Sequence, residues 1–125
     1  MKIENVPGYP GYYISKRGIL WSRRKNKKKW RKLKPYLNTR WNRYQFILMD
    51  KDGERFLWKR SRLVALAWVP NPKPSLYTVV MHLDNDSTND HYRNLKWGTQ
   101  KENIRQCVQE GRIFRNETYY NLINN

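Results

Sequence analysis

The chain has 125 residues, which is enough for one domain or for two small modules that share a core. Its 26 Lys and Arg outnumber its 10 Asp and Glu, so the formal net charge is +16, more than solubility alone requires. No stretch approaches the ~20 apolar residues of a membrane-spanning helix, and the N-terminus lacks the apolar run of a signal peptide. Cys107 is the single cysteine, which excludes an intramolecular disulfide and a cysteine-based zinc site. We therefore expect a cytoplasmic protein with a polyanionic partner and no membrane contact.

The positive charge is concentrated in the first half of the chain. No acidic residue occurs between Asn5 and Met49, and a nearly continuous basic run extends from Arg23 to Lys34. The run lacks the apolar stripe of a membrane-surface helix, so nucleic acid is the better partner. We interpret it as a strand or loop that contacts phosphates rather than as a solvated arm. The residues expected to bind nucleic acid are Arg23, Arg24, Lys25, Lys27, Lys28, Lys29, Arg31, Lys32, Lys34, Arg40 and Arg43.

The first half of the chain also predicts short strands. Extended pieces over 12–15 and 19–22 flank Gly18, which can take the positive φ of a tight turn. A clearer hairpin follows, around a turn that ends in Gly53. Its first strand alternates Tyr44, Phe46 and Leu48 with Gln45 and Ile47, and its second alternates Phe56 and Trp58 with Arg55, Leu57 and Lys59. We expect this hairpin to have one aromatic face and one mixed, partly basic face.

The next segment predicts a short helix and a strand pair. Ser61 stands at the N-cap position of an apolar helix over 62–68, which Pro70 ends. Residues over 76–81 are rich in β-branched types and predict a strand. A polar loop follows, and the segment 94–97 returns as the partner strand.

The last predicted element is a second helix. Thr99 is its N-cap, and Glu102 is the capping-box partner three residues later. The helix is expected to continue to about Glu110, where Gly111 ends it.

One histidine and two asparagines at fixed offsets are the most specific signal in the sequence. His82 is followed by Asn94 twelve residues on and by Asn103 nine further, within VVMHLDNDSTNDHYRNLKWGTQKENI over 79–104. Each residue alone is typical of an ordinary strand end, turn or helix cap. Together, with Leu95 and Trp97 after the middle asparagine, the segment resembles the HNH nuclease motif.

This resemblance implies a role for each of the three residues. His82 would be the general base that takes a proton from water near pH 7. Asn94 would hold the imidazole in orientation through a hydrogen bond. Asn103, on the following helix, would ligate Mg²⁺ or Mn²⁺. A strand pair followed by a helix with the last ligand is the ββα-metal arrangement.

The sequence departs from the motif at Met81. The family usually has Asp, Asn or His at this position as a second metal ligand, whereas a thioether is a poor partner for Mg²⁺. Met81 reads most simply as a core residue that continues Val79 and Val80. Asp84 is the nearest carboxylate that could compensate as a metal ligand, and its alternative role is to order the turn that follows it.

Two upstream segments extend the resemblance. VPGYPGYYISKRGIL over 6–20 resembles the modular element PGYxGYYxVSxxGxV that precedes the HNH core in homing endonucleases of phages and bacteria. RLVALAWVPNP over 62–72 resembles that family's HRLVAxAFxPNP, with Ser61 in place of its histidine. The resemblance covers about residues 3–110 and implies an α+β fold. Its expected parts are a small antiparallel β-rich DNA-binding module over 1–60, a ββα-metal nuclease core over 61–110 and a C-terminal tail over 111–125.

The leading hypothesis is a homing-type HNH endonuclease that binds double-stranded DNA and hydrolyses its phosphodiester bonds with Mg²⁺ or Mn²⁺. We expect a monomer that acts in a bacterial host cell. The alternative is a degenerate HNH protein that binds DNA without cutting it, which Met81 favours. RNA binding by the aromatic sheet is a weaker third hypothesis, because sequence does not separate stacking aromatic residues from core ones.

Overall fold

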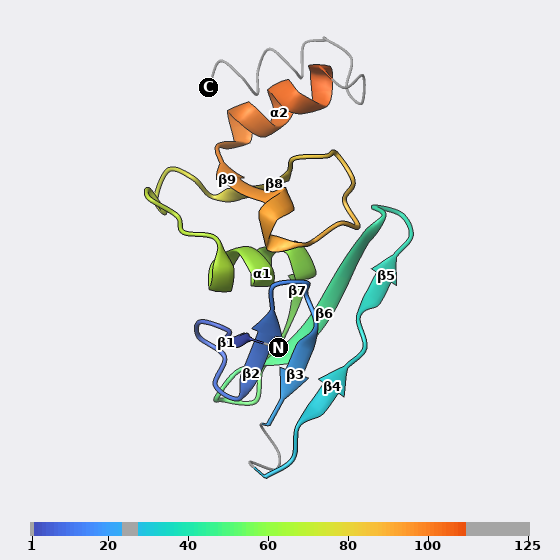
Figure 1. Ribbon diagram of the computed structural model, residues 1–125, viewed down its shortest axis with the longest axis vertical. Helices are drawn as coiled ribbons and strands as arrows, with labels where there is room; N and C mark the ends of the chain where they lie inside the picture. Colours follow the sequence, from blue (N-terminus) through green and yellow to red (C-terminus); the bar gives the residue numbers. More distant parts are fainter. Residues whose placement is uncertain (1, 24–27, 110–125) are drawn as a thin grey trace.

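The computed structural model describes residues 2–23 and 28–109. Within these residues the fold is α+β, with three antiparallel sheets and two α-helices, as the sequence predicts (Figure 1). No helix in the described part is long and apolar enough to cross a membrane.

The first sheet has the strand order β1-β2-β3-β4. Its strands are β1 (Ile3–Asn5), β2 (Tyr12–Ser15), β3 (Leu20–Ser22) and β4 (Arg31–Leu33). Gly18 has φ +90° in the turn between β2 and β3, as predicted, and the backbone N–H of Ile19 donates to Ser15 Oγ at 3.0 Å. The strand β1 was not predicted, whereas the basic run that contains β4 was expected to be a strand or a loop. β4 is part of the basic run, of which residues 24–27 lie outside the described residues.

The second sheet has the order β5-β6-β7, with β5 (Tyr36–Asn38), β6 (Arg43–Met49) and β7 (Arg55–Lys59). The predicted hairpin of β6 and β7 is confirmed, and Gly53 takes φ +84° in its turn. Phe46 and Leu48 are buried on one face, whereas Ile47 between them is 45% exposed on the other. This alternation places the mixed, partly basic face toward solvent.

Helix α1 (Arg60–Trp68) follows β7 without a connecting loop. The predicted N-cap at Ser61 is wrong. The N-cap is Lys59, which makes no side-chain cap bond, and Ser61 lies buried inside the first turn. The helix starts earlier because the last residue of β7 leads directly into it, so no exposed turn remains in which a serine could cap. At the other end, Trp68 Nε1 donates to the carbonyl of Ile14 at 3.0 Å.

The third sheet pairs β8 (Val79–His82) with β9 (Leu95–Gly98), and a short 3₁₀ turn, η1 (Tyr92–Asn94), precedes β9. The strand expected over 76–81 begins later, because Leu76 N–H closes a turn onto the carbonyl of Lys73. Helix α2 (Gln100–Gln109) follows β9. The predicted capping box is confirmed: Glu102 N–H donates to Thr99 Oγ1 at 3.1 Å, and Thr99 N–H donates to Glu102 Oε1 at 3.4 Å. The predicted helix end at Glu110 and Gly111 lies outside the described residues.

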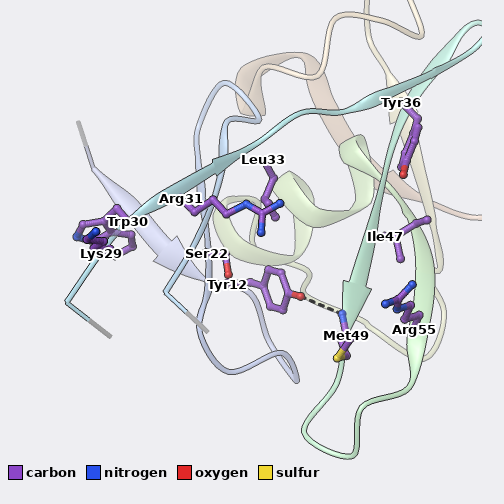
Figure 2. A pocket seen from close by; sticks show the side chains of 10 residues that line it. All are labelled: Tyr12, Ser22, Lys29, Trp30, Arg31, Leu33, Tyr36, Ile47, Met49 and Arg55. Atoms are coloured by element: carbon purple, nitrogen blue, oxygen red, sulfur yellow. Dashed lines mark hydrogen bonds between the residues drawn. The ribbon is translucent and has the colours of Figure 1, made fainter. Parts of the chain in front are cut away.

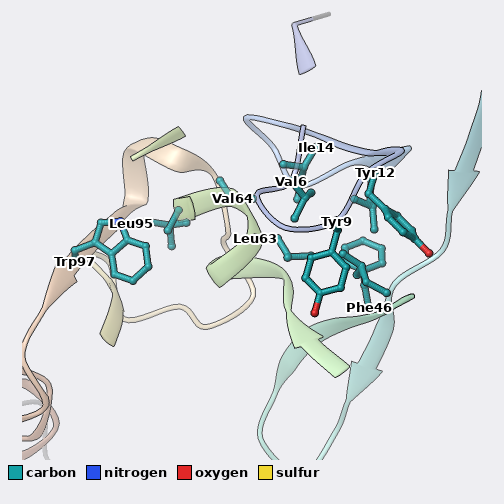
Figure 3. Packing of buried hydrophobic residues seen from close by; sticks show 12 residues of the cluster. Val6, Tyr9, Tyr12, Ile14, Phe46, Leu63, Val64, Leu95 and Trp97 are labelled. Atoms are coloured by element: carbon teal, nitrogen blue, oxygen red, sulfur yellow. The ribbon is translucent and has the colours of Figure 1, made fainter. Parts of the chain in front are cut away.

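Helix α1 is the centre of the core. It contacts β1 and β2 of the first sheet, β6 and β7 of the second, and both strands of the third. Figure 3 shows Val6, Tyr9 and Phe46 on one side of the helix, and Leu95 and Trp97 on the other. The three sheets therefore share one hydrophobic core. The boundary at residues 60 and 61 stays a prediction, as does the tail over 111–125, which lies outside the described residues.

Candidate functional site

A cleft of about 230 Å³ lies beside β8 and α2. It brings His82, at the end of β8, together with Asn103 from α2, whereas Asp84 and Asn94 are not part of its lining. Met81 also faces the cleft. Its other lining residues are Arg43, Lys59, Ser61, Val79, Val80, Asn85, Ser87, Gln106 and Cys107.

The imidazole of His82 is held by Asp90. His82 Nε2 lies 2.7 Å from Asp90 Oδ1, and Asp90 is only 3% exposed. Because an ionised carboxylate only accepts hydrogen bonds, Nε2 carries the hydrogen of the neutral imidazole and Nδ1 keeps its lone pair. No described residue makes a hydrogen bond to Nδ1. The arrangement therefore gives His82 a fixed ring orientation and an available basic nitrogen.

Arg60 is the second partner of Asp90. Its Nε donates to Asp90 Oδ2 at 2.8 Å, and its Nη2 donates to the carbonyl of Thr88 at 2.9 Å. The guanidinium lies 4.1 Å from the centre of the Tyr44 ring. A Cβ atom at Gly18 would lie 2.8 Å from Arg60 Cδ, so the absence of a side chain at Gly18 makes room for Arg60. Arg60 thus links the loop after His82 to the two N-terminal sheets.

Asn94 makes no hydrogen bond to the imidazole in the described part of the chain, and its expected orienting role stays a prediction. Its Nδ2 donates to Asp84 Oδ1 and to the carbonyl of Asn89, each at 2.8 Å, and its Oδ1 accepts from Asp84 N–H at 3.1 Å. Asn94 therefore organises the loop between β8 and η1. The loop in turn places Asp90 beside His82, so any effect of Asn94 on the imidazole is indirect.

Asp84 is likewise engaged within this loop. Its Oδ2 accepts from Asn89 Nδ2 at 2.8 Å, and its Oδ1 accepts from Asp86 N–H at 2.8 Å. These hydrogen bonds, of which the one from Asn89 contributes most, lower the pKa of the exposed Asp84 carboxyl. Asn85 adopts φ +63°, which a turn residue of this type tolerates. The structure thus gives Asp84 its alternative role, the ordering of the turn, and does not bring it into the cleft with Asn103.

Two basic residues also line the cleft. Arg43 and Lys59 come from neighbouring strands β6 and β7 and both line the cleft. Burial lowers the pKa of Lys59, and repulsion by Arg43 and Arg62 lowers it further. Such a cluster of cations raises the local concentration of an anionic ligand such as a phosphate.

The other residues expected to bind DNA lie away from the cleft. Arg31 and Lys32 are on β4, and Lys28, Lys29 and Lys34 are exposed beside it. The Arg23 guanidinium lies 4.6 Å from the Trp30 ring centre, and Arg40 lies 5.2 Å from that of Trp41. Arg24, Lys25 and Lys27 lie outside the described residues.

The second histidine, His91, has a different environment. It is the N-cap of η1, where its Nδ1 accepts from Arg93 N–H at 3.2 Å, and its ring lies beside Tyr92. It does not line the cleft. Of the two histidines, only His82 is therefore placed for chemistry there.

Comparisons with known proteins identify the fold. No family model matches the chain. An uncharacterized HNH endonuclease of Acanthamoeba polyphaga mimivirus is 29% identical over 118 residues, which cover 90% of this chain and 33% of the relative. A second one is 34% identical over 70 residues, which cover 56% of this chain and 18% of that relative. The chain therefore spans a third or less of the length of these relatives.

A solved structure, described as DNA binding and cleavage by the HNH homing endonuclease I-HmuI, matches with a TM-score of 0.74 and 26% identity. The match covers 98% of this chain and 66% of that chain. In sequence and in fold the chain resembles the HNH homing endonucleases. The family resemblance and the α+β fold expected from the sequence are thus confirmed, and the resemblance of the N-terminal segment to a modular element stays a prediction.

HNH nucleases generally use divalent metal ions, so the donor atoms of the cleft can be tested against such an ion. Asn103 offers one amide oxygen. Met81 offers a thioether whose sulfur packs beside Gly98, where a Cβ atom would lie only 2.8 Å from it. No group of three His, Cys, Asp or Glu among the described residues is placed to hold a metal. The residues present therefore do not fit a tight Mg²⁺ site, which needs several hard oxygen donors.

Sequence reasoning missed Asp90 and Arg60. Asp90 is one of three aspartates that follow His82 within eight residues, and nothing in the pattern distinguishes it from Asp84 or Asp86. Its burial beside His82 depends on the path of the whole loop. In this chain the polar partner of the histidine is therefore visible only in the folded structure.

Proposed function

We propose that this chain is an HNH endonuclease that binds double-stranded DNA and hydrolyses its phosphodiester bonds. The observation that carries the proposal is the His82 imidazole, which is fixed by a buried carboxylate in a cleft that Arg43 and Lys59 also line. A general base in a fixed orientation beside a phosphate site is the arrangement that hydrolysis needs.

In the proposed reaction, His82 Nδ1 takes a proton from a water molecule. The water oxygen forms a bond to phosphorus as the bond from phosphorus to the leaving oxygen breaks, and that oxygen takes a proton from solvent. Asp90 holds the imidazole through Nε2, and Arg60 in turn holds Asp90. Arg43 and Lys59 would stabilise the negative charge on the phosphate oxygens.

A requirement for Mg²⁺ or Mn²⁺ is part of the proposal and is supported by the similarity to HNH endonucleases. Asn103 is the residue of this cleft with a hard oxygen for such an ion. Because one amide oxygen is far fewer than the several oxygen donors that Mg²⁺ needs, we expect weak metal affinity that is measurable chiefly when DNA is bound.

We propose that the basic residues on and beside β4, with Arg40 and Arg43, contact DNA phosphates. The exposure of Arg40 and of the basic residues on and beside β4 supports this, as does the acid-free sequence between Asn5 and Met49. Phosphate contacts of this kind position DNA without reading its sequence. A monomer and a bacterial host stay predictions; the two curated relatives come from a mimivirus.

The second candidate function is DNA binding without cleavage. Met81 favours it, because it stands directly before His82 in the sequence, where the family usually supplies a ligand, and its sulfur packs against Gly98. Relaxation of a supercoiled plasmid, with Mg²⁺ or Mn²⁺ and with EDTA, separates the two functions. Cutting that EDTA abolishes supports the nuclease, whereas a gel shift without any cutting supports the second candidate.

A further inference from the structure

A second and larger cavity lies between the first two sheets. It has a volume of about 540 Å³ and shares no lining residue with the cleft. Figure 2 shows Lys29 and Trp30 at one end, Tyr36 and Arg55 at the other, and Tyr12 between them. We call it the sheet pocket, and it is lined by Tyr12, Ser22, Lys29, Trp30, Arg31, Leu33, Tyr36, Ile47, Met49 and Arg55.

The sheet pocket presents flat apolar surfaces to solvent. Trp30 is 45% exposed and Tyr36 is 57% exposed. The Trp30 ring is held by an edge contact with Tyr13, whose ring centre is 5.1 Å away, and by the Arg23 guanidinium at 4.6 Å. An indole held in this way can stack on a planar ligand.

The pocket is also held open by the fold. The backbone N–H of Met49 donates to Tyr12 Oη at 3.1 Å, which joins the second sheet to the first at the floor of the pocket (Figure 2). Tyr12 is otherwise a buried core residue. A preformed site loses less entropy on binding than one that must be assembled.

The charges of the pocket have one sign. Lys29, Arg31 and Arg55 line it, and no acidic residue does. None of the three makes an ion pair within the part of the chain that the structure describes. Cations beside apolar rings fit a ligand with a planar apolar part and an anionic part, which is the chemistry of a nucleotide.

The sheet pocket and the cleft lie on the same face of β6. Arg43 lines the cleft, and Ile47 and Met49 line the sheet pocket. Residues at even spacing along a strand point to the same side, so one continuous face joins the two. Arg43 and Ile47 are about 14 Å apart at ~3.4 Å per residue, which a polynucleotide strand spans within a few nucleotides.

We propose that the sheet pocket binds the base of an unpaired nucleotide, with the neighbouring phosphates on Lys29, Arg31 and Arg55. The proposal rests on the proposed function in so far as the partner is DNA, but it does not require cleavage. The base stacks on Trp30 and the phosphates pair with the three cations. The pocket therefore recognises a bulged or single-stranded position near the site of chemistry, whatever its sequence.

The test is DNA binding by the His82→Ala variant in EDTA, so that cleavage plays no part. The probes are a paired duplex, the same duplex with one unpaired thymine, and the duplex with an abasic residue in place of that thymine. We expect the unpaired thymine to raise affinity about tenfold over the abasic probe. Trp30→Ala should remove this preference and leave affinity for the paired duplex unchanged.

Trp41→Ala is the matched control, because Trp41 is 57% exposed, lies beside Arg40 and does not line the pocket. It should keep the preference. Circular dichroism checks the fold of each variant. A further variant, Arg55→Gln, keeps Trp30 intact. It should weaken binding of the unpaired-thymine probe more than binding of the paired duplex. That difference supports the proposal even if Trp30→Ala does not fold.

Equal binding of the thymine and abasic probes by the parent overturns the proposal, as does an equal effect of Trp30→Ala and Trp41→Ala. If thymidine monophosphate alone binds as tightly as the unpaired-thymine probe, the proposal is overturned in favour of a site for free nucleotides. If the plasmid is not cut but the unpaired thymine is preferred, the nuclease proposal fails and the sheet-pocket proposal stands. If the plasmid is cut but the thymine and abasic probes bind equally, the nuclease proposal stands and the sheet-pocket proposal fails.

Discussion

His82 Nε2 lies 2.7 Å from Asp90 Oδ1, and the other carboxylate oxygen of Asp90 accepts from Arg60 at 2.8 Å. Asp90 is almost completely buried, so its charge depends on these partners. The hydrogen bond between Asp90 and His82 fixes the tautomer and the direction of the imidazole. This relationship connects the candidate base to Tyr44 and Gly18, which pack against Arg60.

The Asp90 contact predicts different results for two substitutions. Asp90→Asn keeps an oxygen that can accept from His82 Nε2, so it should retain most of the cleavage rate. Asp90→Ala leaves the imidazole free to rotate, and the rate should fall about 10- to 100-fold with little change in DNA affinity. It also leaves Arg60 without its carboxylate, at a cost of about 1–3 kcal/mol in the free energy of unfolding. Cleavage rates, gel shifts and urea denaturation measure these effects; an Asp90→Ala enzyme as fast as the parent would refute the positioning role.

Met81→Asp should reduce the metal requirement if position 81 is the missing ligand. One hard oxygen beside His82 should lower the Mg²⁺ concentration for half-maximal cleavage about tenfold, which corresponds to ~1.4 kcal/mol. Met81→Leu is the control, because it keeps an apolar side chain against Gly98 and adds no oxygen. Both variants need a check of folding, since Asp leaves space beside Gly98. If a folded Met81→Asp protein cuts no better than Met81→Leu across a metal titration, another residue supplies the ligand, and Asp84 is the next to test.

Salt dependence should reveal the phosphate contacts. If six or more phosphates are neutralised, log K should fall with log[salt] at a slope of about −5 or steeper. The triple variant Lys28→Gln, Lys32→Gln and Lys34→Gln leaves the sheet pocket intact and should flatten the slope by about 2 to 3. Affinity should fall similarly for unrelated duplexes, because these contacts position rather than specify. Nearly salt-independent binding, or a loss on one sequence alone, would argue against this role.

The capping box of α2 should contribute to stability and to the position of Asn103. Thr99→Ala removes the oxygen that accepts from Glu102 N–H, at an expected cost of about 0.5–2 kcal/mol in the free energy of unfolding. Thr39→Ala is the control, because Thr39 is exposed and its side chain makes no hydrogen bond in the structure. Thermal or urea unfolding compares the two. Equal stability of both variants would mean that the cap is not formed in solution.

The elements with a long or paired pattern were predictable from the sequence. The residue alternation in β6 and β7 is a local pattern, and so is the capping box at Thr99. The folded structure keeps the hairpin and the cap that these patterns predict. The short strands β1 and β5 have three residues each, too few to show a period, and they form because neighbouring strands offer hydrogen-bond partners. Ser61 failed as a cap for the related reason that a strand runs directly into the helix.

The candidate site was predictable in part. The spacing of His82 and Asn103 follows from a strand pair and a helix, and the structure brings both to one cleft. The partner of His82 was not predictable, because the loop from Asp84 to Asp90 has several residues that can fill this role. Its path is decided by hydrogen bonds of Asp84, Asn89 and Asn94 with one another, so Asp90 rather than Asn94 reaches the imidazole.

The most direct test of the account compares the two histidines in plasmid cleavage. His82→Ala should lower the cleavage rate about 10²- to 10⁴-fold, because it removes the general base, while DNA affinity stays nearly unchanged. His91→Ala should cut almost normally, since His91 only caps η1 and lies outside the cleft. Rates are measured on supercoiled plasmid with Mg²⁺ or Mn²⁺, with EDTA as the blank. An active His82→Ala protein, or an inactive His91→Ala protein beside it, would contradict the assignment of the base to His82.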